Sequence, residues 1–264
     1  LDQNGNENMF ITYGDLDWSV SEVKVTTYSD GTPIPLVSDG AEWSSLTTGA
    51  YCYVDNDPNN NILYNYYAII GKHDDDEITP NKSLAPNGWR MPSNTDWNNL
   101  VDYISNSDYI SDENVAMAMA STSGWSNTYF LGDDPSQTPY SCPPGTPGYS
   151  QSENNASCFN AYPNGTRDNG GLFYQQDETS EFWSTTDVSS SNATTQYINT
   201  GVNNFITGSN DKRNGASVRF VRDYDNSCDG ANNSWSQVGQ TISGNDLLSA
   251  DSLTSALGES VAIN

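Results

Sequence analysis

A stretch of alternating polar and aromatic residues near the end of the aromatic-rich part of the chain could bind a polar ligand such as a sugar. Amides and carboxylates hydrogen-bond to sugar hydroxyls, aromatic faces contact sugar CH groups, and protein interfaces also favour Tyr and Trp. The candidate ligand-binding residues are Trp183, Asp187, Asn192, Tyr197, Asn199, Asn203, Asn204 and Asn210. The alternative is that Trp183 and Tyr197 belong to the core and the asparagines to turns.

Carboxylates and amides also gather in loops, where their oxygens could hold calcium, a hard cation that takes several oxygen ligands. Asp55, Asp57 and Asn59 in DNDPNNN are the candidate metal ligands. The pattern is not an EF-hand, because Asn60 stands where that loop needs glycine and Tyr66 where it needs glutamate. Structural calcium is thus the one cofactor that the sequence suggests, and a solvated loop is the alternative.

Four cysteines, Cys52, Cys142, Cys158 and Cys228, show no CxxC spacing. The single histidine, His73, makes a zinc site a poor interpretation. Disulfide bonds in an oxidising compartment fit better, and a Cys142–Cys158 bond would close a loop rich in Pro, Gly, Ser and Asn. Cys52 and Cys228 would be the remaining pair, although four cysteines allow three pairings in all.

Catalytic patterns find little support. His73 lies in an acidic run away from any nucleophile motif, which argues against Ser–His–Asp or Cys–His chemistry. Arg90 and Asp96 flank a turn in GWRMPSNTDW, but Ser93 and Asp96 can begin a helix and Trp97 can fill a core. We expect no catalytic residues. A two-carboxylate enzyme stays open, because its chemistry depends on a separation in space.

The charge balance excludes two classes of partner. The 264 residues include 9 Lys and Arg against 34 Asp and Glu, a formal net charge of −25, which repels nucleic acid and anionic head groups. No run is long enough for a transmembrane helix, so we expect no direct membrane insertion. In so acidic a chain, Arg167, Arg219 and Arg222 are expected to form internal salt bridges.

Short strands must carry most of these residues. Only 34% of residues are apolar, yet 7 Trp, 16 Tyr and 7 Phe are present, which indicates an aromatic-rich core and β structure. Alternation and β-branched content predict strands within 9–28 and at 50–54, 63–70, 172–175, 181–186, 195–200, 203–207 and 216–223. The last strand should place Val218 and Phe220 on the face opposite Arg219 and Val221, and 9–14 should pair with 216–222.

One helix is clear from its start signal and spacing. Ser93 is a good N-cap, Asp96 stands at the third helical position, and apolar residues recur from Trp97 to Ile104 with helical spacing. A weaker helix is predicted at 113–121 and a single turn at 41–46. Strands, then helices, then strands make an α+β domain.

Composition also divides the chain. Polarity rises after Tyr224 and the aromatic residues become rare, which predicts a domain over residues 1–224. Residues 225–264 are then a linker or the start of a further repeat.

Several segments occur in an order that resembles one family. They include FITYGDLDWSVSEVKVTTYSDGTPIP (10–35), LAPNGWRMPSNTDWNNLVDYI (84–104), AYPNGTRDNGGLFY (161–174), FWSTTD (182–187) and NGASVRFVRD (214–223). The chain resembles the Fibrobacter succinogenes major paralogous domain, a bacterial surface module grouped with C-type-lectin-like folds. The resemblance implies such a fold with long loops, and a variable surface within residues 183–213. Ala85 and Phe220 stand where many members carry cysteines, so that bridge is expected to be missing.

The expected function is therefore binding outside the cell. We expect a secreted or cell-surface module for adhesion, or for recognition of a glycan or a surface protein, through polar loops. The alternative is a structural subunit or spacer that contacts other subunits of an extracellular assembly or filament. A glycan-active enzyme is the third alternative.

Overall fold

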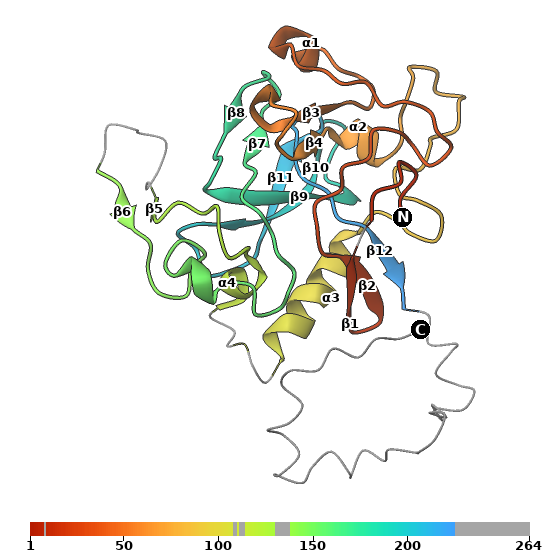
Figure 1. Cartoon of the computed structure of the whole chain (residues 1–264). Helices are drawn as coiled ribbons and strands as arrows, with labels where there is room; N and C mark the ends of the chain where they lie inside the picture. The colour runs from red at the N-terminus through yellow and green to blue at the C-terminus, as the bar shows by residue number, and fades with distance from the viewer. Residues whose placement is uncertain (8, 108–109, 111–113, 130–137, 225–264) are drawn as a thin grey trace, which may run out of the picture. The chain divides into compact units, whose positions relative to one another are not determined.

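The computed structural model describes residues 1–7, 9–107, 110, 114–129 and 138–224 (Figure 1). These belong to one compact unit, Leu1–Tyr224. Residues 225–264, for which we predict a linker or a further repeat, lie outside the described residues, as does Cys228. Within the described part, every helix is too short or too polar to cross a membrane.

The fold is α+β, with short antiparallel strands in five small sheets among the described residues. The strands are β1 (Phe10–Tyr13), β2 (Leu16–Ser19), β3 (Tyr51–Tyr53), β4 (Ile62–Tyr64), β5 (Thr128–Tyr129), β6 (Tyr140–Ser141), β7 (Thr166–Arg167), β8 (Phe173–Tyr174), β9 (Thr179–Asp187), β10 (Asn192–Asn199), β11 (Ile206–Asp211) and β12 (Val221–Asp223). The helices are α1 (Gly40–Ser44), α2 (Tyr66–Ile69), α3 (Asn94–Ser105) and α4 (Val115–Met119), with 3-10 turns η1 (Val54–Asn56) and η3 (Gln151–Glu153).

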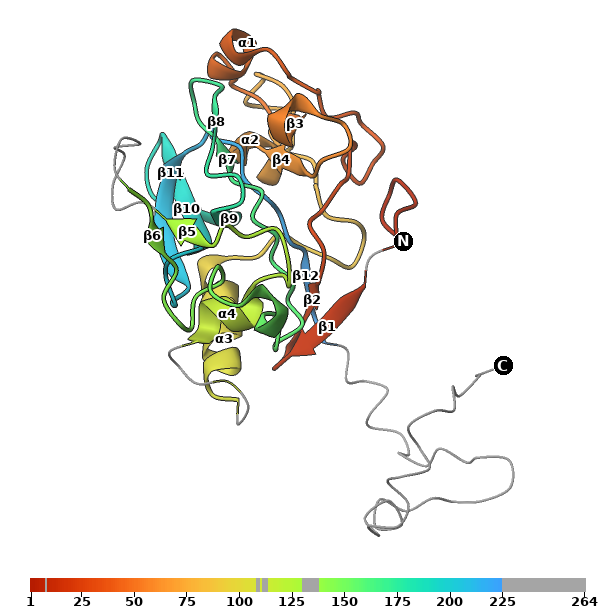
Figure 2. The same ribbon diagram turned by 60° about the vertical axis from the view of Figure 1, so that its left-hand side comes forward.

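The sheet β11-β10-β9 separates two hydrophobic cores. Side chains alternate between its faces, so Trp183 and Ala193 enter the core built on α2 and the β3–β4 hairpin. Phe182 and Ile198 pack on the other side against α3 and α4. Both views show this layering, with β3, β4 and α2 on one side of β9 and α3 and α4 on the other (Figures 1 and 2).

A second sheet joins the two ends of the compact unit. Its order is β1-β2-β12, so the last strand pairs with β2. The predicted pairing of this strand with residues 9–14 is therefore wrong. The predicted alternation is confirmed: Val218 and Phe220 enter the α2 core, whereas Val221 enters the α3 core and Arg219 stacks on its aromatic rings. The strand itself is shorter than predicted, because the chain before it forms only isolated bridges, such as Ser217 to Phe182.

Helix α3 begins as its sequence predicts. Ser93 is the N-cap and forms a capping box with Asp96, in which each side chain bonds the other residue's backbone N–H. Arg90 adds a bidentate pair to the Asp96 carboxylate at 2.6 and 2.9 Å. The buried face of the helix carries Trp97, Leu100 and Ile104. The prediction that Ser93 and Asp96 begin a helix and that Trp97 fills a core is therefore confirmed.

Two predicted strands are wrong in part. The segment 63–70 leaves the strand conformation after Tyr64 and forms α2, because the Asn65 side chain accepts a hydrogen bond from Ala68 N at 3.0 Å and caps a helix. The strand predicted at 203–207 begins only at Ile206. The predicted turn at 41–46 and the weaker helix at 113–121 correspond to α1 and α4.

The three arginines for which the sequence predicts internal salt bridges all bond within the protein, and Arg167 and Arg219 are fully buried. Arg219 pairs with Glu22 at 3.2 Å, and Arg222 pairs with Asp17 at 2.9 Å, as predicted. Arg167 differs, since its guanidinium donates to backbone carbonyls of Val37, Ser38 and Gly171 and lies 4.5 Å from the centroid of Trp43. Arg167 thus joins two loops through their backbone carbonyls, and no carboxylate of the described residues pairs with it, contrary to the predicted salt bridge.

The predicted Cys142–Cys158 bond is not formed. Cys52, Cys142 and Cys158 are free thiols, and the two ends of the expected bridge lie in different surroundings. The Cys142 sulfur is buried between Ser126 O and Thr200 Oγ1, at 3.6 and 3.7 Å, whereas Cys158 is exposed. Cys52 is buried in a small core, where burial raises the pKa of its thiol to about 12.

Candidate functional site

A polar groove of about 440 Å³ opens on the face of the central sheet that carries Trp183. The strand register creates it. Tyr197 on β10 lies opposite Glu181 on β9 and Ile206 on β11, and Asn199 lies opposite Thr179. Directly paired residues in antiparallel strands project from the same face, so these side chains share one surface. Thr166, Gln175, Asn210 and Asn214 complete the polar lining, to which Val202 adds an apolar contact.

Glu181 is the carboxylate of this groove, and its surroundings are neutral. The residue is 6% exposed, and its Oε1 accepts a hydrogen bond from Asn210 Nδ2 at 2.7 Å. Burial raises the pKa of Glu181 to about 7, and the neighbouring Thr195 hydroxyl lowers it by less. Among the described residues that line the groove, Lys and Arg are absent.

The amides beside Glu181 are partly preorganised. Asn199 Nδ2 donates to Thr179 Oγ1 at 3.0 Å, while its Oδ1 accepts from Gly201 N at 3.1 Å. Tyr197 is half-buried, and burial followed by the nearby Glu181 carboxylate raises the pKa of its phenol. A ligand would therefore meet a fixed amide edge, a phenol ring and one carboxyl group.

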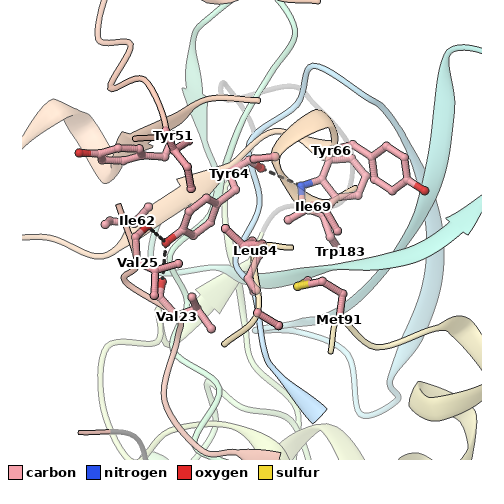
Figure 3. Close-up of a cluster of buried hydrophobic side chains, with 14 of the residues drawn as sticks. Val23, Val25, Tyr51, Ile62, Tyr64, Tyr66, Ile69, Leu84, Met91 and Trp183 are labelled. Atoms are coloured by element: carbon pink, nitrogen blue, oxygen red, sulfur yellow. Dashed lines mark hydrogen bonds between the residues drawn. The ribbon is translucent and has the colours of Figure 1, made fainter. Parts of the chain in front are cut away.

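The structure divides the predicted ligand-binding residues. Tyr197, Asn199 and Asn210 meet in the groove. Trp183 does not, because it is fully buried and donates from Nε1 to Tyr64 O at 2.8 Å, with its ring 5.4 Å from that of Tyr66 (Figure 3). For Trp183 the structure favours the core alternative.

The other four predicted residues lie away from this lining. Asp187, at the end of β9, pairs with Lys212 at 2.7 Å. Asn192 begins β10 and accepts a hydrogen bond from Ser191. Asn203 contributes its backbone carbonyl to Ala116 N, and Asn204 is exposed in the turn before β11.

Sequence reasoning missed Glu181, Gln175 and Asn214. A signal for Glu181 existed: in TSEFWSTT it stands two residues before Trp183, so a two-residue period assigns both to one face. An acid on the face of a core tryptophan is a candidate for burial. Gln175 and Asn214 lie in connecting segments, where the sequence gave no periodic signal.

The predicted metal loop lies elsewhere, between β3 and β4. Asp55 and Asn59 line a second groove of about 380 Å³ together with Asp177. Asp57 instead accepts hydrogen bonds from Asn59 N and Nδ2 at 2.9 and 2.8 Å. Within the described ranges, no three His, Cys, Asp or Glu side chains gather closely enough to hold a metal. The calcium site stays a prediction.

The chemistry available in the groove around Glu181 is recognition by hydrogen bonds and by one buried carboxyl. Glycoside hydrolysis commonly uses two carboxyl groups that flank the bond, and the described lining provides one. Glu181 could exchange a proton near neutral pH, since its pKa lies there. A second carboxyl group, which that mechanism would need, is absent from the described lining.

Comparison with known proteins places the chain in a family. Residues 11–222 match the Fibrobacter succinogenes major domain. No curated protein and no solved structure matches the chain. The match covers most of the sequence and reaches from within the first strand to within the last. The chain therefore belongs to the Fibrobacter succinogenes major domain family.

Proposed function

We propose that this protein is a secreted or cell-surface binding module that recognises a glycan through the groove around Glu181. The observation that carries the proposal is the convergence of Tyr197, Asn199 and Asn210 with a buried carboxyl in one concave surface. Small-ligand sites are typically clefts of roughly 300 to 1,000 Å³, and this groove falls in that range.

The lining matches the two surfaces of a sugar. Amide groups of Asn210 and Asn214 offer donors and acceptors to hydroxyls, and the half-buried Tyr197 ring offers an apolar face. Val202 and Ile206 provide further apolar contact beside the amides. Hydrogen bonds with Thr179 and Gly201 already fix the side-chain amide of Asn199. This side chain therefore loses little conformational entropy when a ligand binds.

We also propose that the α+β fold is of the C-type-lectin-like kind. A C-type-lectin-like arrangement is supported by strands from both ends of the compact unit pairing in one sheet, and by long irregular segments between short strands. We propose extracellular localisation with a glycan or a surface protein as partner. A structural calcium ion at Asp55, Asp57 and Asn59 is part of this proposal.

A glycan panel tests the proposal. The full chain is screened with and without calcium, next to Tyr197→Ala and Asn214→Ala. Two matched variants outside the groove, Tyr149→Ala and Asn204→Ala, replace an exposed tyrosine and an exposed asparagine. We expect the groove variants to weaken binding about fivefold or more, since each removes a contact of roughly 1 kcal/mol or above, and the matched variants to bind as the parent does.

Two results would contradict the proposal. One is a parent chain that binds no glycan in the panel while β9 to β11 are buried against another chain, which would favour the structural-subunit alternative. The other is glycan binding that the Tyr149→Ala and Asn204→Ala variants weaken as much as the groove variants do.

A further inference from the structure

Three of the described buried acids of this protein share a feature that Glu181 lacks. Asp17, Glu22 and Asp96 are each buried, and each accepts from an arginine, at 2.9, 3.2 and 2.6 Å respectively. Burying an ionised carboxylate without a positive partner is costly, so such pairing is the usual solution. These three pairs use Arg222, Arg219 and Arg90, although arginine and lysine are scarce in the chain.

Glu181 is as deeply buried but has only neutral neighbours. Asn210 donates to it at 2.7 Å, and Thr195 and Tyr197 lie beside it. The described lining of the groove contains no cation. The other charged groups nearby are already engaged, since Asp211 on β11 pairs with Arg213 and Arg167 on β7 bonds to backbone carbonyls. The groove therefore presents a carboxyl group that nothing in the described protein neutralises.

We propose that this groove binds a ligand that carries a protonated primary amine, specifically an amino sugar without its N-acetyl group, and that Glu181 pairs with the ammonium. The inference rests on the proposed function, because it names the class of sugar that the same groove takes. The ammonium supplies the positive partner that Glu181 lacks, while Asn210, Asn214 and Tyr197 contact the rest of the ring. Any proton on Glu181 leaves to solvent when the pair forms.

Two features of the chain favour an amine over a neutral sugar. A charge-assisted hydrogen bond in a partly dry groove is about twice as strong as a neutral one. The net charge of −25 also concentrates cations near the surface and repels acidic sugars. An N-acetyl group would bring a neutral amide to Glu181 and leave the carboxylate without a counter-charge.

Calorimetry on the full chain at about pH 6.5, where a large share of the amines of a glucosamine oligomer is protonated and Glu181 can release its proton as the pair forms, tests the inference. The probes are an oligomer of β-1,4-linked glucosamine, the N-acetylglucosamine oligomer of the same length, and a β-1,4-linked glucose oligomer. We expect the glucosamine oligomer to bind about tenfold or more tightly than the other two. Glu181→Gln, which preserves the acceptor for Asn210, should remove this preference but retain weak binding of all three.

Matched variants separate the site from general attraction to an acidic protein. Asp102→Asn removes one exposed charge from α3, which covers the opposite face of the sheet, and should leave the preference unchanged. Val202→Lys places an ammonium group in the groove and should abolish the preference by occupying Glu181. Thermal unfolding of each variant verifies that it is folded.

Several outcomes would overturn the inference. Equal binding of glucosamine and N-acetylglucosamine oligomers would refute it while the proposed function stands. No binding of any of the three oligomers would also refute it, and the glycan panel would then test the proposed function separately. A preference for the amine that persists in Glu181→Gln would show attraction to the whole surface. A lysine oligopeptide that binds as tightly, and needs Glu181, would refute the assignment to a sugar.

Discussion

Two buried glutamates of this protein, Glu22 and Glu181, differ in what surrounds them. Glu22 accepts from the fully buried Arg219 at 3.2 Å and from Tyr162 N at 3.0 Å, so its charge and its hydrogen bonds are both satisfied. Glu181 has a neutral amide and a hydroxyl, and it opens on a groove. Equally buried glutamates thus have different surroundings: Glu22 joins segments of the chain through Arg219, whereas Glu181 lines a groove and, in our proposal, pairs with a ligand.

The difference arises because one of the few arginine side chains of the protein lies beside Glu22 and none lines the groove around Glu181 among the described residues. Arg219 also donates to Ser19 O and Asn160 O and lies 4.6 Å from the centroid of Phe159, so it joins three segments that are distant in sequence. A cation placed at Glu181 would have stabilised β9 to β11 in the same way. Because the described lining contains no such cation, the protein is less stable at this position than it could be, as is common at functional sites.

The largest expected effect comes from breaking the satisfied pair. Arg219→Met should destabilise the protein by about 3 to 5 kcal/mol, because it leaves Glu22 buried without a positive partner. Urea unfolding followed by tryptophan fluorescence measures the loss. The double variant Arg219→Met with Glu22→Gln should recover part of it. A double variant no more stable than the single one would show that the ionic pair is not what matters.

The next effect has the opposite sign and depends on pH. Burial raises the pKa of Glu181 from its ordinary value of 4.5 to about 7, so the folded protein keeps a proton that the unfolded chain loses between these values. The contribution of Glu181 to the free energy of unfolding is fully present below about pH 4 and is lost as the pH rises through 7. Above pH 7 the free energy of unfolding is then lower by about 3 kcal/mol. Glu181→Gln cannot lose this proton.

We therefore expect Glu181→Gln to match the parent at about pH 4 and to exceed it by about 3 kcal/mol at pH 8. Urea unfolding at both pH values provides the measurement. Glu22→Gln serves as the comparison, since removing the partner of Arg219 should destabilise the protein at pH 8. A Glu181→Gln variant less stable than the parent at pH 8 would mean that Glu181 has a structural role like that of Glu22.

Local signals in the sequence were sufficient for part of this fold. Helix α3 was predicted from Ser93 to Ile104 because its cap, acidic third position and apolar spacing all lie within twelve residues. Helix α2 was missed because Asn65 ends a strand and caps a helix in one step, which apolar composition does not reveal. The pairing of β12 with β2 depends on contacts far apart in sequence, and nothing local distinguishes β2 from β1 as its neighbour.

The site shows the same limit. Residue type alone brought Tyr197, Asn199 and Asn210 into the prediction, but it also brought in Trp183, whose burial depends on Tyr64 and Tyr66. Glu181 was missed because an acidic side chain in a polar sequence is ordinarily solvated. Its burial is created by three strands that meet only in the folded chain.

The smallest expected effect concerns a third acid, Asp96, which lies between the two extremes. Burial alone would raise the pKa of Asp96, but hydrogen bonds from Arg90 and Ser93 together lower it. The Arg90 side chain is 45% exposed, so solvent screens the pair. Because Ser93 still donates to Asp96 from N and Oγ, Arg90→Gln should cost less than about 1 kcal/mol in urea unfolding. A loss as large as that of Arg219→Met would show that exposure does not rank these pairs, and the contrast between Glu22 and Glu181 would then need another cause.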